Sequence, residues 1–382
     1  MPFAVTCVPE FDPSPAPMPA SLFFPSLVSS LCVKVWIMRL FLSFGLLLVF
    51  LSLITPAWAG QANMFVYHRF GDARYPSTNI ALEVFAEQLE LLRTKEYTVL
   101  PLRDVVDRLT QGTPLPERCA VLTVDDGYES FLTGAMPLLR RYGYPVSLFV
   151  STDSVGAPGY LGWDQLRALR DEGVEIGNHS ASHPYLLDRQ KGEDEAAWLT
   201  RIRGDIERAS AVMQRELGGM SGVFAYPYGE YSPEVAKLVR ELGFAGAVAQ
   251  HSGVVEAAAD PFVLPRFPMG GAYATFVEFR DKLAMRPLKL KVMSPESPVI
   301  TGKNPPELLV EIIDGEADLK GLRCFVGGQE GGIVEPVAGH PGRYRVVASA
   351  PLEGRRGRYT LTAPGRNGGW HWFSQLWVQP RP

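Results

Sequence analysis

The stretch CAVLTVDDG, residues 119–127, is an apolar run that ends in two adjacent aspartates and a glycine. Its apolar part is typical of a buried strand, and the charges begin where that run stops. Neighbouring carboxylates repel each other, and burying them is unfavourable unless they are paired or bound to a metal ion. We therefore expect a cation to hold Asp125 and Asp126 together at the end of this strand.

Strand-like and helix-like segments alternate around this stretch, from Met64 to about Met285. The alternation predicts an α/β fold with a parallel sheet, either open or closed into a barrel. In such folds the chemistry lies at the carboxyl ends of the strands. Four residues that could carry chemistry are predicted at such ends: Asp125, Asp126, His179 and Tyr228.

Helix boundaries can be predicted within this region from capping residues. A long helix is expected within residues 194–217, and another ends at Gly143. A third has Ser232 as its N-cap and Pro233 in its first turn.

The pattern changes at about Leu288, where short alternating runs are separated by Gly and Pro. This favours a small antiparallel β-sandwich, immunoglobulin-like in plan. We accordingly predict a first domain at residues 60–287 and a second at residues 288–382. The second domain is expected to position or dock substrate, with association with the cell envelope as one way of doing so.

The overall composition limits the class of protein. The chain has 382 residues, is 46% hydrophobic and 20% charged, and carries a formal net charge of −4. These values indicate a globular protein with a substantial core. The charge gives no reason to expect nucleic acid or an anionic membrane surface as a partner.

The N-terminal segment has the pattern of a secretory signal peptide. An arginine and an apolar run precede the triplet Ala57-Trp58-Ala59, which predicts residues 38–59 as the signal peptide, with cleavage after Ala59. Residues 1–37 are then an extension upstream of the true start at Met38. Export would place the protein in the periplasm or outside the cell. The alternative is an uncleaved membrane anchor.

Four cysteines occur, and export would leave Cys119 and Cys324 in the mature chain. Exported proteins work in an oxidising compartment. Because Cys119 opens an apolar strand, we expect a buried free thiol there rather than a disulfide.

A second polar segment, GNHSASHPYL, places His179 and His183 four residues apart. On a helical turn the two rings would share a face and could reach one ion. A structural role for the pair is the alternative. If one of the two aspartates joins the histidines as a metal ligand, the other can stay beside the metal-bound water.

The motifs TVDDG, HSASH and FAYPYG, in this order, resemble those of the polysaccharide deacetylase family (NodB-homology domain, carbohydrate esterase family 4). The resemblance implies a distorted (β/α) barrel. It further implies that Asp126, His179 and His183 bind a divalent metal, that Asp125 is the general base, and that the backbone N–H of Tyr228 stabilises the oxyanion. Two imidazoles and one carboxylate favour Zn²⁺.

Two departures from the family pattern concern the remaining catalytic groups. Ala225 stands where the family usually has arginine, and Arg266 is a candidate to replace it; a surface ion pair is the alternative. The late histidine that usually acts as the acid is absent. Instead His68, in MFVYHRF, resembles the branch that acts on poly-β-1,6-N-acetylglucosamine, although it could be a core residue.

Three functions remain open from the sequence. The first is a hydrolase that removes N-acetyl groups from N-acetylglucosamine units of an extracellular or cell-wall polysaccharide. The second is an O-acetyl esterase, on acetylxylan for example. The third is a non-catalytic carbohydrate-binding protein. Aromatic residues could line a sugar site or belong to the core: Tyr160, Trp163, Trp370, Trp372 and Trp377. Oligomeric state is left open.

Overall fold

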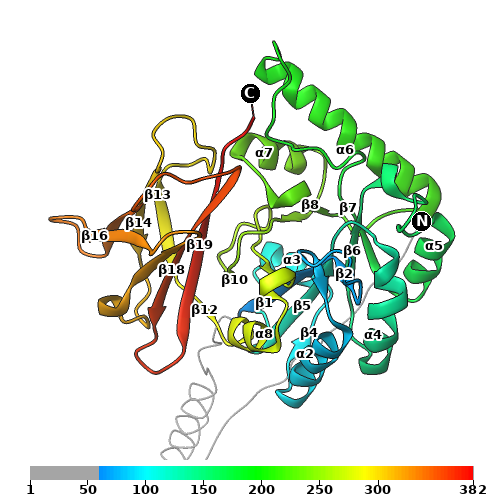
Figure 1. Ribbon diagram of the computed structural model, residues 1–382, viewed down its shortest axis with the longest axis horizontal. Helices are drawn as coiled ribbons and strands as arrows, with labels where there is room; N and C mark the ends of the chain where they lie inside the picture. The colour runs from blue at the N-terminus through cyan, green and yellow to red at the C-terminus, as the bar shows by residue number, and fades with distance from the viewer. Residues whose placement is uncertain (1–59, 382) are drawn as a thin grey trace, which may run out of the picture. The chain divides into compact units, whose positions relative to one another are not determined.

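The computed structural model describes residues 60–381 (Figure 1). The predicted upstream extension and signal peptide therefore lie outside the described residues. By their contacts, the described residues belong to one compact unit, so the predicted boundary between residues 287 and 288 stays a prediction. No helix in the described part of the chain is both long enough and apolar enough to cross a membrane.

The first two thirds of the described chain are built on a mainly parallel sheet with the order β10-β1-β5-β6-β7-β8-β9. Strand β11 pairs with β1, and β4 pairs with β5. The strands are β1 Ala62–Tyr67, β4 Thr98–Val99, β5 Cys119–Val124, β6 Ser147–Val150, β7 Glu175–Asn178, β8 Val223–Ala225, β9 Gly246–Val248, β10 Val254–Val255 and β11 Phe267–Pro268. A separate pair is formed by β2 Arg69–Phe70 and β3 Asn79–Ile80.

This sheet is curled, and one segment forms backbone pairs with strands near both of its edges. Leu264 pairs with Val248 of β9, and Phe267 pairs with Phe65 of β1. The predicted α/β class is confirmed, and the sheet is curled rather than flat. The curl brings the carboxyl ends of β1, β5, β7 and β8 towards a common region.

Helices cover the outside of this curled sheet (Figure 1). They are α2 Leu82–Thr94, α3 Leu102–Gln111, α4 Met136–Tyr142, α5 Trp163–Asp171, α6 Glu195–Leu217, α7 Pro233–Glu241 and α8 Phe276–Leu283. Buried apolar residues of α2 and α4, such as Leu89 and Leu139, pack in the same core as Leu122 of β5.

The predicted helix boundaries are confirmed by the capping contacts. The Asp194 carboxylate accepts a hydrogen bond from the N–H of Ala197 at the start of α6, and Ser232 caps α7 in the same way. Gly143 ends α4 in the left-handed conformation. Two short helices, α3 and α8, were not among the predicted elements.

The remaining strands form one eight-stranded sheet in the order β12-β19-β18-β15-β16-β17-β14-β13. All pairs are antiparallel except β12 with β19. The strands are β12 Arg286–Pro287, β13 Leu290–Ser294, β14 Glu307–Ile312, β15 Arg323–Val326, β16 Gly332–Pro336, β17 Arg343–Ala348, β18 Arg356–Pro364 and β19 Trp370–Val378. The immunoglobulin-like plan stays a prediction.

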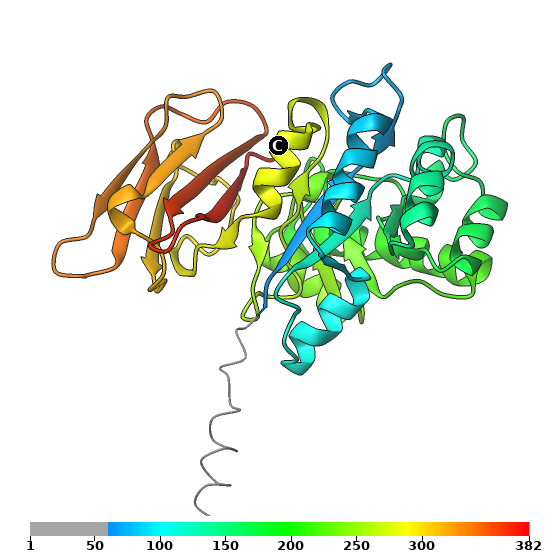
Figure 2. The same cartoon turned by 90° about the horizontal axis from the view of Figure 1, so that it is seen from below.

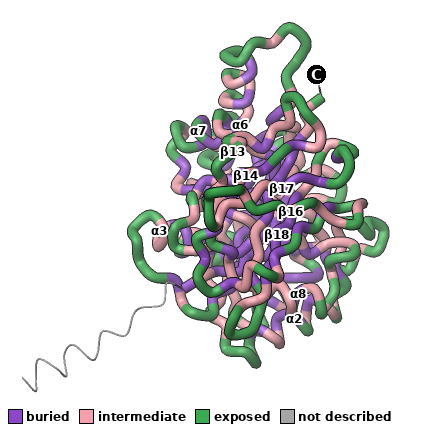
Figure 3. Tube along the Cα trace, turned by 90° about the vertical axis from the view of Figure 1, so that its left-hand side faces the viewer, coloured by how far each residue is buried: buried purple, intermediate pink, exposed green. Residues whose placement is uncertain are grey.

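This second sheet has a core of its own, to which Val310 of β14 and Leu361 of β18 contribute from distant strands. Exposed residues lie mostly in its loops, as Figure 3 shows. Both cysteines in the described part of the chain, Cys119 and Cys324, are buried and free, which confirms the prediction for Cys119.

Strand β19 also packs against the first sheet. Leu376 and Val378 share a core cluster with Tyr226 and Phe262, and the Trp372 ring lies 5.8 Å from that of Phe267. Figures 1 and 2 show β19 next to α8. The two sheets therefore share buried apolar contacts.

Candidate active site

The two aspartates that follow β5 lie in a turn that requires left-handed backbone conformations. Asp126 has φ +76° and Gly127 also has φ +76°, both in the left-handed region. A Cβ atom on Gly127 would approach Cγ1 of Val150 to 2.8 Å, so glycine is required there on two grounds. The turn ends the strand, and the carboxylates of Asp125 and Asp126 therefore contact different groups.

The two histidines come together through a loop after β7 and not through a helical turn, so the predicted helical spacing is wrong. Ser180 and His183 have φ +66° and +52°, which is incompatible with a right-handed helix. Local hydrogen bonds replace helical ones: the Ser180 N–H donates to Oδ1 of Asn178 (2.7 Å), and the His183 N–H donates to Oγ of Ser180 (3.0 Å).

A carboxylate from α6 holds the same loop from outside. Oδ2 of Asp205 accepts hydrogen bonds from the N–H groups of Ala181 (3.0 Å) and Ser182 (3.3 Å). Its Oδ1 accepts from the Ser182 hydroxyl (2.9 Å) and from Arg208 (2.9 Å). Asp205 was not predicted from the sequence, because nothing in a helix sequence marks which acid faces a loop.

Asp126, His179 and His183 form a compact set of ligand atoms. Oδ1 of Asp126 lies 3.5 Å from Nε2 of His179 and 3.3 Å from Nε2 of His183. The two Nε2 atoms are 3.2 Å apart, and all three ligand atoms lie within 4.8 Å of one another. Such a set of two imidazoles and one carboxylate suits a divalent metal ion.

The tautomer of His179 supports this assignment. Nδ1 of His179 is 2.8 Å from the backbone oxygen of Ala225, and a carbonyl oxygen can only accept a hydrogen bond. Nδ1 therefore carries the proton, and Nε2 directs its lone pair towards Asp126 and His183. This backbone contact fixes the ring as outer contacts do in metal sites.

Asp125 lies beside this set but is bound to a different group. Its two carboxylate oxygens accept hydrogen bonds from Nη1 and Nη2 of Arg266, each at 2.7 Å. Both side chains are completely buried, so the alternative of a surface ion pair is wrong. Arg266 also donates to the carbonyl of Ala249 (2.8 Å) and to Oγ1 of Thr123 (3.0 Å).

The pKa of Asp125 reflects these surroundings. Burial on its own raises the pKa of this carboxyl group, but the Arg266 guanidinium and the nearby histidines outweigh burial and lower it below its usual value. Nε2 of Gln250 adds a further hydrogen bond to Oδ2 at 3.2 Å. Gln250 follows β9 as a polar residue after an apolar run, a signal that could have identified it from the sequence.

Backbone strain is concentrated around these side chains. Five non-glycine residues in the described part of the chain have positive φ, and four of them are Asp126, Ser180, His183 and Tyr228. Tyr228, with φ +58°, lies in the short 3₁₀ turn Pro227–Gly229 that follows β8. Non-glycine residues keep a positive φ only where the surrounding structure holds them in that conformation. Such residues cluster at functional sites.

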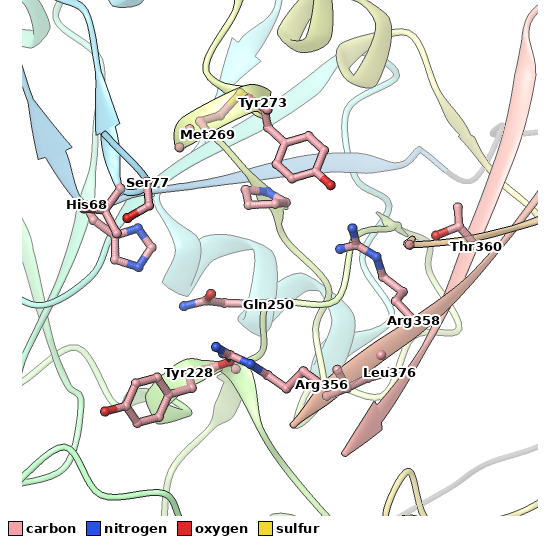
Figure 4. Close-up of a pocket in the computed structure, with 18 of the residues that line it drawn as sticks. His68, Ser77, Tyr228, Gln250, Met269, Tyr273, Arg356, Arg358, Thr360 and Leu376 are labelled. Atoms are coloured by element: carbon pink, nitrogen blue, oxygen red, sulfur yellow. Dashed lines mark hydrogen bonds between the residues drawn. The ribbon is translucent and has the colours of Figure 1, made fainter. Parts of the chain in front are cut away.

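His68 follows β1 and lines the same cleft as Asp126, His183 and Tyr228. Figure 4 shows His68 and Tyr228 in this cleft. The cleft has a volume of about 1380 Å³. Burial lowers the pKa of the His68 ring below 6.5, although Asp126 and Asp125 act in the opposite direction. The structure thus brings all the predicted site residues to one region, with Arg266 behind Asp125.

The aromatic candidates divide between cleft and core. Tyr160 and Trp372 line the cleft, whereas Trp163 packs against the core and Trp377 is buried in the core of the second sheet. Trp370 is exposed. His251 is only partly accessible, and its Nδ1 is buried with no hydrogen-bond partner among the described residues.

The site therefore combines three side chains that could hold a metal ion with an adjacent buried carboxylate, an arrangement that suits hydrolysis. Comparison with known proteins agrees: residues 112–247 match the family model described as polysaccharide deacetylase. The matched region is similar to polysaccharide deacetylases, which are hydrolases. Both aspartates, both histidines and Tyr228 fall inside the match, whereas His68 and Arg266 fall outside it.

Individual relatives are distant. A putative polysaccharide deacetylase of Bacillus subtilis, YxkH, is 22% identical over 236 residues, which are 59% of this chain and 80% of that protein. The poly-β-1,6-N-acetyl-D-glucosamine N-deacetylase of Escherichia coli K12 is 25% identical over 221 residues, 49% of this chain but only 33% of that protein.

Among solved structures, the Streptococcus pyogenes deacetylase PplD in complex with acetate superimposes with a TM-score of 0.52 at 19% identity. It covers 58% of this chain and 98% of that structure. At this identity the comparison supports the fold of the deacetylase domain and nothing finer.

Proposed function

We propose that this protein removes N-acetyl groups from N-acetylglucosamine units of a polysaccharide outside the cytoplasm. The observation that carries the proposal is the position of Asp125, buried next to the set Asp126, His179 and His183 at the cleft that His68 lines. A binding protein without activity has no need to bury a second carboxylate next to a metal set, because such burial is unfavourable.

We assign the metal site to zinc because of its ligand types. A zinc ion bound by Asp126, His179 and His183 would polarise the acetamide carbonyl and lower the pKa of water at the site. The protein's own contribution is to supply the ligand atoms and to hold them with Ala225 and the Asp205 contacts described above.

Asp125 acts as the general base in this proposal. Its lowered pKa keeps it ionised at neutral pH. Each carboxylate oxygen has two lone pairs, so an oxygen that accepts from Arg266 can still accept a proton from the attacking water. Arg266 fixes the orientation of the carboxylate and replaces the arginine that the family usually has at the position of Ala225.

Two further groups act on the acetyl group and on the amine. The backbone N–H of Tyr228 donates a hydrogen bond to the oxyanion of the tetrahedral intermediate. His68 donates a proton to the departing amine, because an amide anion is a poor leaving group. The products are acetate and a glucosamine unit.

The relatives named above and the predicted signal peptide support an exported polysaccharide of the poly-β-1,6-N-acetylglucosamine type as substrate. The test is acetate release by the purified mature protein from a panel of N-acetylated and O-acetylated glycans, with and without a chelator. We expect release from N-acetylglucosamine oligomers that the chelator abolishes and Zn²⁺ restores. Release from acetylxylan alone would instead identify an O-acetyl esterase.

A further inference from the structure

The second sheet reaches the active site through Arg355, which directly precedes β18, and Arg356, the first residue of that strand. The guanidinium of Arg355 makes two hydrogen bonds to the Glu230 carboxylate, at 2.7 and 2.6 Å, and one to Asp188 at 2.6 Å. The Glu230 side chain is completely buried, and that of Arg355 is 11% exposed. A buried carboxylate needs such a partner, so this ion pair ties β18 to the segment that follows Tyr228.

A column of stacked side chains leads from Arg355 towards the metal ligands. The Arg355 guanidinium lies 4.0 Å from the centre of the Tyr185 ring, and Tyr185 stacks on Tyr228 with ring centres 4.0 Å apart. On its other side, Tyr228 contacts the ring of His183 edge-on at 4.4 Å. A side chain of the second sheet is thus connected to a metal-ligating histidine through two aromatic rings.

Arg356, the next residue, contacts Tyr228 directly. Nη1 of Arg356 donates a hydrogen bond to the Tyr228 carbonyl (2.9 Å), and its guanidinium lies 5.5 Å from the centre of the Tyr228 ring. Figure 4 shows the two side chains next to each other in the cleft. The Arg356 side chain is 42% exposed, so it has little part in the core.

These contacts hold a residue that is strained. A tyrosine at φ +58° has a conformational cost of about 1–3 kcal/mol, which the surroundings must offset. If the hydrogen bond to the Tyr228 carbonyl is lost, the turn can relax by rotation of the Pro227–Tyr228 peptide plane, which changes ψ of Pro227 and φ of Tyr228. That rotation would also turn the peptide N–H of Tyr228 away from the oxyanion.

We propose that Arg356, anchored by the Arg355–Glu230 ion pair, is a positioning residue that holds the Tyr228 turn in its active conformation. The second sheet is then part of the catalytic unit and not a separable docking module. The role of Tyr228 in this inference rests on the proposed function.

The experiment uses the full mature chain and replaces Arg356 by Ala or by Lys. Lysine can still donate to the Tyr228 carbonyl. Arg345 is the matched control: it lies in β17 of the same sheet, is 37% exposed and pairs with Glu307 and Glu335. We would measure kcat and KM on a soluble N-acetylglucosamine oligomer, zinc content, Tm, and hydrogen exchange of peptides spanning residues 226–231.

Arg356→Ala should lower kcat about tenfold to a hundredfold, less than complete removal of an oxyanion donor does. KM, zinc content and Tm should stay at wild-type values. Exchange at residues 226–231 should become about tenfold faster, because the turn opens more often. Arg356→Lys should recover part of both effects, and Arg345→Ala should show neither.

Wild-type kcat and exchange in Arg356→Ala would overturn the proposal. A rise in KM at constant kcat would also overturn it, by showing that Arg356 binds substrate. A Tm that falls in step with kcat, without recovery by lysine, would show a purely structural role. If the wild-type protein releases no acetate, the proposed function fails, and the exchange measurements alone then decide whether Arg356 holds the turn.

Discussion

Arg266 and Asp125 are 141 residues apart in the sequence and make two parallel hydrogen bonds of 2.7 Å with no solvent exposure on either side chain. The segment that carries Arg266 pairs with β1 and β9, whereas Asp125 follows β5. The proposed base is therefore oriented by the segment that links the two edges of the curled sheet. Charge pairs of this planar geometry are among the strong hydrogen-bonded contacts in proteins.

Replacing Arg266 by Met should affect both stability and the pH profile. The variant leaves Asp125 buried and unpaired, which typically costs about 3–5 kcal/mol of unfolding free energy. Without the guanidinium, the pKa of Asp125 should rise, so the acid limb of kcat/KM should move to higher pH. Urea unfolding at pH 7 and a pH–rate profile would measure the two effects.

The sign of the pH effect follows from the direction of the shift in the wild-type protein. The pKa of Asp125 is lowered on folding, so its contribution to stability is present above the unfolded pKa and is lost as the pH falls through the folded value. Arg266→Lys keeps one charge and should fall between the wild type and Arg266→Met. An acid limb that does not move would contradict the role given to Arg266.

The two adjacent aspartates should differ in their effects on metal. Asp126→Asn, like His179→Ala and His183→Ala, should lose stoichiometric zinc, because each removes one of the three proposed ligands. Asp125→Asn should keep zinc and lose nearly all turnover. Elemental analysis of the dialysed proteins separates these outcomes, and equal zinc loss in the two Asn variants would show that the roles are wrongly divided.

The hydrogen bonds from the loop to Asp205 predict an effect on metal affinity. Asp205→Asn weakens the acceptors for Ala181 and Ser182, and contacts of this kind are worth about 10–100-fold in metal affinity. A competition titration with a chelator measures it. Glu207→Gln, on the same helix, is the control and should bind zinc as the wild type does; an unchanged affinity in Asp205→Asn would disprove the contribution.

Loss of His68 should depend on the leaving group. His68→Ala should lower kcat on N-acetylglucosamine oligomers by about 10²–10⁴, the usual contribution of general acid catalysis. An activated aryl acetate needs no protonation of its leaving group and should lose much less. Zinc content should not change. Equal losses on the amide and on the ester would mean that His68 positions substrate or supports the fold.

His251 should make the fold sensitive to mild acid. Burial first, and then Arg358 and Arg266, lower the pKa of its imidazole to about 4, so the ring stays neutral in the folded protein at pH 5. The unfolded chain binds the proton below about pH 6.5, which costs roughly 2 kcal/mol of stability at pH 5 relative to pH 7. His251→Gln should reduce this dependence in urea unfolding at the two pH values; an undiminished dependence would assign it to other groups.

Much of the first sheet could be predicted from local sequence. Apolar runs such as residues 119–124 become buried strands because their side chains have no other way to leave water, and Asp194 and Ser232 start helices through contacts within four residues. The positions of Asp125, Asp126 and His179 at strand ends followed from the same reasoning.

The geometry of the histidine loop could not be predicted in this way. The spacing of His179 and His183 fits a helical turn as well as it fits the observed loop. Asn178, Ser180 and the distant Asp205 decide between the two by taking up the backbone N–H groups that a helix would use.

The local sequence was enough to predict the strand ends, the residues proposed as metal ligands and the change to an all-β pattern after about Leu288. The pairing of Arg266 with Asp125, and that of Arg355 with Glu230, 125 residues away, could be seen only in the folded protein. The sequence around a charged side chain does not show which residue it will pair with. Which opposite charge they meet depends on how the first sheet closes and how the second packs against it, and burial then makes each pairing obligatory.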